Sequence, residues 1–389
     1  MLGTYGEIVP YAECVGQPVA VPLSAVRYHS CMLALFLMAA AIAPPGVVID
    51  HEPAAARRYI GSPSIVVLQD GSYVASHDFF GPASNENVSG VTRVFRSTDR
   101  GRSWQRAADL TDQFWSNLFV HRGALYLMGT SCQYGRIVIR RSRDGGRTWS
   151  GPSFLTAGPH YHTAPVPVVL YKHRVWRAFE YHPQGPWGFF QALVLSAPEK
   201  ADLLDARSWT MAPRLPFPAD APQGKHWLEG NAVVGPRGKL LDILRVDNVE
   251  EIALVRVEWG GLHFEGMADF PGGAKKFTIR YDRKSRLYWA LSNPAPKAKN
   301  PASVRNTLAL VSSPDLRHWQ VRRIVLTHPD SRHHAFQYVD WQFDGRDIVA
   351  VSRTAFDDEE GGAHSFHDAN FLTFHRIERF RESGSGPQP

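Results

Sequence analysis

One short pattern, Ser-x-Asp-x-Gly-x-x-Trp, occurs twice in this chain and constrains its fold more than any other feature. It spans residues 97–104 and returns at residues 142–149. A third copy at residues 313–319 is one residue shorter and lacks the glycine. In such a turn the aspartate accepts hydrogen bonds from the backbone, the glycine takes a positive φ, and the tryptophan is buried beneath. The repetition predicts an array of similar β-hairpins, although each copy alone could be a plain hairpin turn.

The pattern resembles the Asp-box of bacterial neuraminidase repeats, a turn between the two outer strands of a β-propeller blade. The resemblance implies an all-β chain folded as a β-propeller. Because the box lies at the periphery of the blade, away from the central cavity, it indicates the fold and says little about chemistry.

The rest of the chain supports one large all-β domain at residues 46–381. The sequence has 389 residues, of which 44% are hydrophobic, with 32 glycines and 28 prolines that separate many short strands. Six hairpins, each opening with an apolar strand, can be placed at residues 63–77, 117–130, 166–181, 231–245, 277–292 and 336–353. A strand at residues 370–380 is expected to complete a blade with residues 47–50 and close the ring. We therefore count six blades and expect a disordered tail at residues 382–389.

The N-terminal region, residues 1–45, is expected to be a leader. Residues 32–43 form a short apolar run whose last three residues, Ala-Ile-Ala, resemble the box recognised by signal peptidase. The run is too short to span a bilayer, so we expect no stable membrane association. The prediction is a secreted or periplasmic protein, and a buried strand or helix is the alternative for this run. Cleavage would leave Cys132 as the only cysteine, which excludes a disulfide framework.

The distribution of charge favours a small acidic ligand over a nucleic acid. The formal net charge is +6, but the basic residues are spread along the chain without a lysine-rich run. We expect an acidic oligosaccharide or polysaccharide as the partner, no binding of nucleic acid, and a monomer.

Polar side chains gather at one end of the predicted blades. In a propeller each inner strand starts at one face of the ring and the next strand returns to that face, so these positions share one rim. The predicted site residues at this rim are His77, His160, His162, Tyr181, Lys225, His226, Glu229, Arg245, Lys276, His333, His334, Gln337, Arg353 and His367. Each alone could be structural, but together they predict a cationic pocket that holds a carboxylate.

Two stretches of the rim resemble the sialidases. In that family a Tyr/Phe-Arg-Ile-Pro motif in the first blade supplies one of three arginines that bind the carboxylate of sialic acid. The matching stretch here has Gly61 or Ser62 in place of that arginine. Residues 228–245 resemble the fourth blade of the family, which implies that Glu229 and Arg245 take the corresponding rim positions.

The family's late tyrosine nucleophile is not found where the last inner strand should open, because residues 334–336 are His-Ala-Phe. With one arginine and the nucleophile missing, sialidase activity is not the favoured hypothesis.

Three further stretches, residues 59–65, 75–82 and 367–377, resemble a secreted branch of Asp-box proteins. That branch includes rhamnose-α-1,4-glucuronate lyases and related rhamnosidases, which trim the side chains of arabinogalactan. The resemblance covers residues 59–380 and implies a ring of seven blades, one more than the hairpins indicate. It also implies β-elimination at a rhamnosyl-α-1,4-glucuronate linkage.

The chemistry of the rim suits elimination independently of that resemblance. Removal of the proton at C5 of a uronate requires a neutralised carboxylate and a base whose pKa is near neutral. The assignments are Arg245 for the carboxylate, Lys225 or Lys276 as a second cation, His77 as the base, and Tyr181 or His162 as the acid.

Two alternatives are compatible with the same fold. A rhamnosidase-like or sialidase-like glycoside hydrolase would ask for facing carboxylates, and the rim offers Glu229 and Asp78. A non-catalytic propeller would bind acidic glycans without cleaving them. No spacing typical of metal ligands occurs, so we expect no required cofactor, with a structural calcium in the tunnel left open.

Overall fold

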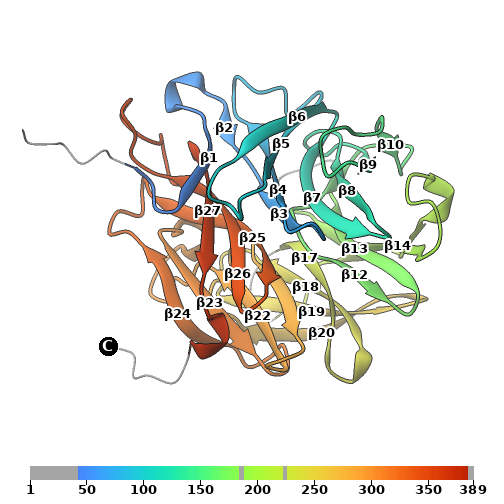
Figure 1. Cartoon of the computed structure of the whole chain (residues 1–389). Helices are drawn as coiled ribbons and strands as arrows, with labels where there is room; N and C mark the ends of the chain where they lie inside the picture. Colours follow the sequence, from blue (N-terminus) through green and yellow to red (C-terminus); the bar gives the residue numbers. More distant parts are fainter. Residues whose placement is uncertain (1–42, 184–187, 222–225, 384–389) are drawn as a thin grey trace, which may run out of the picture. The chain divides into compact units, whose positions relative to one another are not determined.

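Six antiparallel sheets make up the described part of the chain, residues 43–183, 188–221 and 226–383 of the computed structural model. The sheets are the blades of a β-propeller (Figure 1), which confirms the predicted all-β fold. These ranges contain no α-helix, and no helix in them is long and apolar enough to cross a membrane. The six blades agree with the hairpins counted from the sequence. The seven implied by the lyase branch are wrong for this chain.

The first three blades differ in their number of strands, counted from the inner edge outward. Blade 1 has β2 (Tyr59–Ile60) and β3 (Ser64–Val67), then β4 (Tyr73–Phe80), β5 (Val91–Ser97) and β6 (Gln105–Thr111). Blade 2 has β7 (Phe114–His121), β8 (Ala124–Thr130), β9 (Ile137–Ser142) and β10 (Ser153–Phe154). Blade 3 has β11 (Tyr161–His162) and β12 (Val168–Tyr171), then β13 (Arg174–Tyr181), β14 (Gln191–Pro198), β15 (Thr210–Met211) and β16 (Leu215–Pro216).

The other three blades each have four strands. Blade 4 has β17 (Trp227–Val234), β18 (Leu240–Val246), β19 (Glu251–Glu258) and β20 (Gly261–Asp269). Blade 5 has β21 (Thr278–Asp282), β22 (Leu287–Ser292), β23 (Thr307–Ser313) and β24 (Gln320–Thr327). Blade 6 has β25 (Ala335–Asp344), β26 (Asp347–Ala355), β27 (Phe371–Ile377) and β1 (Val47–His51). The short 3₁₀ helices are η1 (Ala54–Ala56), η2 (Ala206–Ser208), η3 (Pro236–Gly238), η4 (Pro301–Ser303) and η5 (Phe380–Glu382).

The ring closes through blade 6, which combines both ends of the described chain. Strand β1 pairs antiparallel with β27, so that Val47 lies opposite Phe374. In Figure 1 the blue β1 accordingly lies beside the red β27. This confirms the pairing expected between residues 47–50 and 370–380. The predicted leader and tail lie almost entirely outside the described residues and stay predictions.

The hydrophobic core is divided into layers between neighbouring blades. Six clusters of buried apolar side chains each join two successive sheets around the ring. Trp227 fills the layer between blades 3 and 4, and Trp289 and Trp341 fill the layer between blades 5 and 6; each is at most 2% exposed. Since every blade buries both faces, its strands are apolar on both sides, and polar side chains are left to the strand ends and the tunnel.

The three copies of the repeated pattern form turns with closely similar hydrogen bonds. In the first, the Ser97 hydroxyl donates to Asp99 Oδ1 (2.8 Å) and accepts from the N–H of Gly101 (2.8 Å). The second has the same two bonds around Asp144, and the third has them around Asp315, with Leu316 in place of the glycine. Leu316 adopts the positive φ of 68° and is fully buried. All three turns join the two outer strands of a blade, as the pattern predicts.

Candidate active site

A cavity of about 450 Å³ opens at the end of the tunnel where the inner strands begin. Ser62 precedes β3, Phe114 starts β7, and Leu228 lies near the start of β17; all three line it. Asp78, Arg245 and Arg353 reach it from the ends of second strands. The starts of the inner strands and the ends of the second strands therefore meet at one rim, as predicted from the sequence.

A tyrosine and a glutamate are hydrogen-bonded to each other in this cavity. The hydroxyl of Tyr338 donates to Glu229 Oε1 at 3.0 Å. Both residues have positive φ angles, 54° and 57°, and both lie at irregularities in the pairing of their strands, β25 and β17. Trp115 also has a positive φ, 46°, and lies at an irregularity in the pairing of β7. Bulges re-aim side chains, and backbone strain of this kind in residues other than glycine clusters at functional sites.

Three arginines surround the pair. Arg245 comes from β18, Arg353 from β26, and Arg305 from the segment between η4 and β23; each is at most 7% exposed. Arg245 Nε lies 2.9 Å from Glu229 Oε2. Burial lowers the pKa of Arg245, but the charge of Glu229 opposes this and the pKa ends above its ordinary value.

The other two arginines have no carboxylate partner among the described residues. Arg305 Nη1 donates to Gln337 Oε1 (2.6 Å) and its Nε donates to the carbonyl of Ala302 (3.0 Å). Arg353 donates to the carbonyl of His367. Burial lowers the pKa of Arg353 to about 10, which is still far above neutral, so this guanidinium stays charged. Buried charges are normally paired, so two unpaired guanidinium groups side by side make a site for an anion.

Asp78 lies in the same cavity and is almost fully buried. Its Oδ1 accepts a hydrogen bond from the N–H of Ser62 (2.6 Å), and its Oδ2 accepts one from the N–H of Trp115 (2.5 Å). Burial raises the pKa of Asp78 to about 6 in spite of these two bonds. A carboxyl group with this pKa is half protonated at a pH of about 6, so it can serve as a general acid in weakly acidic solution.

The close approach of Asp78 explains why glycine occupies position 61. A Cβ atom added to Gly61 would lie 1.7 Å from Asp78 Oδ1, so no side chain fits there. The position of Asp78 therefore excludes an arginine at position 61, one of the two places that match the arginine of the sialidase motif. Arg353 brings a third guanidinium group into the cavity from blade 6 instead.

We expect Gly61→Ala to destabilise the fold by about 1–3 kcal/mol, because the new methyl group would displace the Asp78 carboxyl. Urea unfolding followed by tryptophan fluorescence would measure the change in the free energy of unfolding. Gly151→Ala is the matched control, since nothing lies within 4 Å of a Cβ atom added at that position. Equal stability of the two variants would contradict the contact.

The wall near blades 2 and 3 is aromatic. The His162 ring lies 4.5 Å from that of Trp115, centroid to centroid, and the Tyr134 ring is also close to both. His162 Nδ1 lies 2.8 Å from Glu180 Oε2, and Glu180 Oε1 in turn accepts a hydrogen bond from the N–H of Gly230. Glu180 thereby holds the orientation of His162 and supports the backbone next to Glu229.

Five of the residues predicted from the sequence line the cavity: His162, Glu229, Arg245, Arg353 and His367. Gln337 does not line the cavity, but its side-chain oxygen accepts a hydrogen bond from Arg305. Lys276 is buried beneath, where its ammonium group donates to the carbonyl of Val339 (2.8 Å) and burial lowers its pKa to about 8. Lys225 lies outside the described residues.

His77, the residue assigned as the base, does not line the cavity. It is fully buried, with Nε2 at 2.9 Å from Asp50 Oδ2 and Nδ1 at 2.9 Å from the carbonyl oxygen of Asp78. Both ring nitrogens are therefore engaged by neighbouring oxygen atoms, and neither is free to contact a substrate. The position of His77 therefore does not suit the role of a base.

The remaining predicted residues also lie away from the cavity lining. They are Tyr181, which stacks with Arg214; His160, beside Tyr181; His226, paired with Asp247; and His333 and His334, which both contact Asp330. Some of the predicted rim residues therefore line the cavity, and the others contact residues outside it.

Two groups that line the cavity were missed from the sequence, the phenol of Tyr338 and the guanidinium of Arg305, and Asp78 was named only as a carboxylate for the hydrolase alternative. Tyr338 was missed because the bulge that turns it into the cavity leaves no mark in the sequence of β25, which mixes apolar and polar residues. The one available indication is that Tyr338 is the only tyrosine in that strand. Arg305 lies in a loop that periodicity does not describe.

Comparison with known proteins finds similarity in structure only. No protein-family model matches the sequence, and no curated protein is significantly similar to it. Among solved structures, the Hadza microbial sialidase Hz136 is 12% identical with a TM-score of 0.60, covering 86% of this chain and 68% of its own. The Trypanosoma rangeli sialidase in complex with sialic acid is 14% identical with a TM-score of 0.56, covering 86% and 59%.

An α-L-arabinofuranosidase from Fusarium graminearum is 11% identical with a TM-score of 0.55, covering 87% of this chain and 98% of its own. This chain therefore has a sialidase-like propeller fold. At such identities the likeness shows the fold alone, and the chemistry must be argued from the cavity.

No group of three or more His, Cys, Asp or Glu side chains in the described ranges is arranged to hold a metal ion. The expectation that no cofactor is required stays a prediction, as does the option of a calcium in the tunnel.

Proposed function

We propose that this protein is a retaining glycoside hydrolase that removes a terminal sugar of the 2-ulosonic acid type, such as a sialic acid. The observation that carries the proposal is the hydrogen bond between Tyr338 and Glu229, in a cavity that also holds three buried arginines and the acid Asp78. The structural neighbours include sialidases and arabinofuranosidases alike, so the choice between these glycosidases rests on the cavity.

The arginines define the charge of the substrate. The cavity lining holds the carboxyl groups of Asp78, Glu86, Glu229 and Asp247 beside the three guanidinium groups, but among these four only Glu229 forms an ion pair with one of the arginines, so a ligand carboxylate would be the partner of the other two. Arg305 and Arg353 lack carboxylate partners and are the groups that would hold it, while Arg245 stays paired with Glu229. Paired guanidinium–carboxylate bonds also fix the orientation of the sugar ring.

Tyrosine is a suitable nucleophile for a substrate whose carboxylate is attached to the anomeric carbon. A carboxylate nucleophile would be repelled by that group at close range, whereas a neutral phenol is not. A free phenol is a weak nucleophile, so it must lose its proton as it attacks. Glu229, at 3.0 Å from the hydroxyl, accepts that proton.

The reaction would proceed in two steps. In the first, Tyr338 Oη bonds to the anomeric carbon, Glu229 takes the phenolic proton, Asp78 gives its proton to the leaving oxygen, and the glycosidic bond breaks. In the second, Asp78 takes a proton from water, the resulting hydroxide bonds to the anomeric carbon, and the bond to Tyr338 breaks as Glu229 returns its proton. Two displacements retain the anomeric configuration.

β-Elimination at a rhamnosyl-glucuronate linkage is less well supported by this geometry. Its assigned base, His77, is enclosed in blade 1, and its assigned acid Tyr181 lies outside the cavity. His162 lines the cavity, but its Nδ1 is engaged by Glu180. Elimination can still be tested directly. It forms an unsaturated uronate that absorbs in the ultraviolet, whereas hydrolysis forms no such product.

The proposal is tested by trapping the intermediate. The protein would be incubated with a 2,3-difluorinated sialic acid analogue, digested and analysed by mass spectrometry. We expect the added mass on the peptide that contains Tyr338, and release of methylumbelliferone from a sialic acid conjugate by the untreated protein. A panel of sialic, glucuronic and rhamnosyl conjugates would be measured in parallel. Cleavage confined to the rhamnosyl-glucuronate member, with a rise in ultraviolet absorbance, would overturn hydrolysis in favour of elimination.

A further inference from the structure

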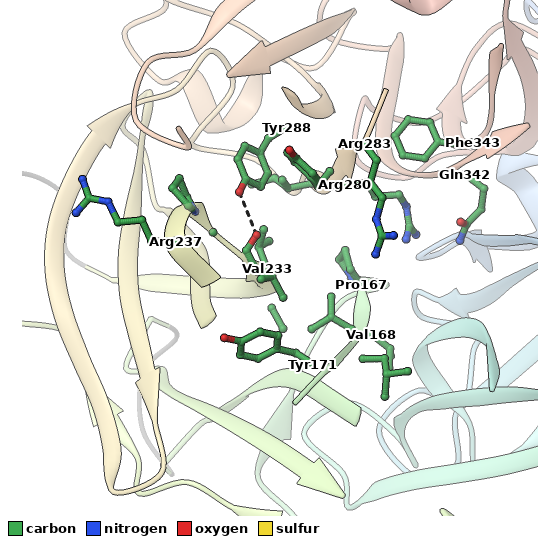
Figure 2. Close-up of a pocket in the computed structure, with 18 residues that line it drawn as sticks. Pro167, Val168, Tyr171, Val233, Arg237, Arg280, Arg283, Tyr288, Gln342 and Phe343 are labelled. Carbon is green, nitrogen blue, oxygen red and sulfur yellow. Dashed lines mark hydrogen bonds between the residues drawn. The ribbon is translucent and has the colours of Figure 1, made fainter. Parts of the chain in front are cut away.

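A second cavity, of about 670 Å³, lies where the inner strands end (Figure 2 shows its lining residues). It is lined by the last residues of inner strands β12, β17, β21 and β25, together with η3. Because the inner strands of a propeller all run in the same direction, their starts form the candidate active site and their ends form this cavity. Its volume falls in the range of pockets that hold small ligands, about 300–1,000 Å³.

The ionisable lining of this cavity is basic. Arg280, in β21, and Arg283, in the turn that follows this strand, both line it, and no acidic residue of the described chain lines the cavity. Arg280 donates to the carbonyl of Trp341 (2.6 Å) and contacts Asp340 (3.2 Å), which holds its guanidinium in place. Arg283 is exposed and forms no ion pair with a carboxylate among the described residues. Arg237 also borders the cavity, but Figure 2 shows its side chain pointing away.

Two tyrosine rings also line the cavity, Tyr288 from β22, which pairs with the strand that carries Arg280, and Tyr171 from β12. The hydroxyl of Tyr288 donates to the carbonyl of Val234 (3.1 Å), and that of Tyr171 donates to the carbonyl of Gly238. These bonds anchor the polar ends of both rings at the backbone of blade 4. Tyrosine rings held in this way offer rigid, amphipathic contact area of the kind that binding sites use for amphipathic ligands.

We propose that this second cavity binds an acidic oligosaccharide, with its carboxylate at Arg283 and Arg280 and the C–H face of a sugar ring against Tyr171. Charge complementarity favours an anion, and the aromatic wall favours a sugar over a small inorganic anion. The choice of an acidic glycan over other ring-bearing anions rests on the proposed function. The cavity has no carboxyl group that could act as acid or nucleophile, so it would hold a glycan without cleaving it.

Calorimetric titration of the full chain tests this inference. The protein would carry Tyr338→Phe to prevent turnover, and 3′-sialyllactose would be the ligand, with lactose as the neutral control and inorganic sulfate as the simple anion. We expect two sites for sialyllactose. Adding Arg283→Gln should weaken one of them about tenfold or more, and Tyr171→Ala should weaken the same one. Lys284→Gln, in the same turn but outside the cavity, should change neither.

The outcomes separate this inference from the proposed function. A single site that is lost with Arg353→Gln but unchanged by Arg283→Gln overturns the second site alone. A single site lost with Arg283→Gln but unchanged by Arg353→Gln overturns the proposed function alone. Equal binding of sulfate and sialyllactose at the Arg283 site, or binding of lactose with the same affinity, also overturns the inference, because it requires both the charge and the sugar ring.

Discussion

Tyr338→Phe should lower kcat/KM by at least about 10³-fold, because it removes the atom that bonds to the substrate. The substitution deletes only the hydroxyl. The ring would keep its place near Arg305 and Arg353, whose guanidinium carbons lie 5.5 Å and 5.0 Å from its centroid. Binding of the carboxylate should therefore persist, so that KM or a measured dissociation constant changes much less than kcat.

The measurement is steady-state hydrolysis of a methylumbelliferyl conjugate, with circular dichroism to establish that the variant is folded. Tyr181→Phe is the matched control, since Tyr181 lies in blade 3 outside the cavity, and it should retain nearly full activity. Near-normal turnover by Tyr338→Phe would rule out a covalent intermediate on this residue. A large loss in Tyr181→Phe would instead favour the role as acid that the sequence suggested for it.

Asp78→Asn should show an effect that depends on the leaving group. Protonation of the leaving oxygen matters most when the alcohol is a poor leaving group, so hydrolysis of a natural disaccharide should fall by about 10²–10⁴-fold. An activated aryl conjugate leaves without help, and its first step should be nearly unaffected. Loss of activity to the same extent on both substrates would indicate that Asp78 acts only in holding the N–H groups of Ser62 and Trp115.

The pH profile gives a second test of Asp78. Burial raises the pKa of this carboxyl to about 6, and the protonated form is the one that donates. Activity on the disaccharide should therefore decline as the pH rises through about 6, and this limb should be absent in Asp78→Asn. The free energy of unfolding should depend on pH in the same direction. Because folding raises the pKa of Asp78, the fold favours the protonated carboxyl, so the stabilisation that this group contributes is present at low pH and is lost as the pH rises through about 6. A profile unchanged by the substitution would assign the limb to another group.

The agreement between sequence and structure is closest where local chemistry decides the outcome. Hairpin turns, apolar strands and the repeated Ser-x-Asp pattern each depend on residues near one another in the chain. The six blades could therefore be predicted from the sequence, and the pairing of β1 with β27, which joins the two ends of the described chain, followed from the ring closure that a propeller requires. The rule that strand starts and second-strand ends share one rim also located the general region of the cavity, including Glu229, Arg245 and Arg353.

The identity of the reacting groups depended on contacts between distant segments. Tyr338 and Glu229 are 109 residues apart, and each is turned toward the other by a bulge that the pattern of side chains does not reveal. Asp78 acquires its raised pKa only through burial beside Gly61 and Trp115. His77, conversely, has the residue type of a base but is enclosed by Asp50, 27 residues earlier.

The sequence by itself determined that this chain forms a propeller with charged groups at one mouth, because period, turn chemistry and composition are properties of short segments. Only the tertiary structure decided which of those groups face the same cavity and which pair with loops, because a one-residue irregularity in a strand reverses the face to which a side chain points. For that reason the tyrosine inside β25, rather than the histidines at the strand ends, is the group on which the proposed chemistry depends.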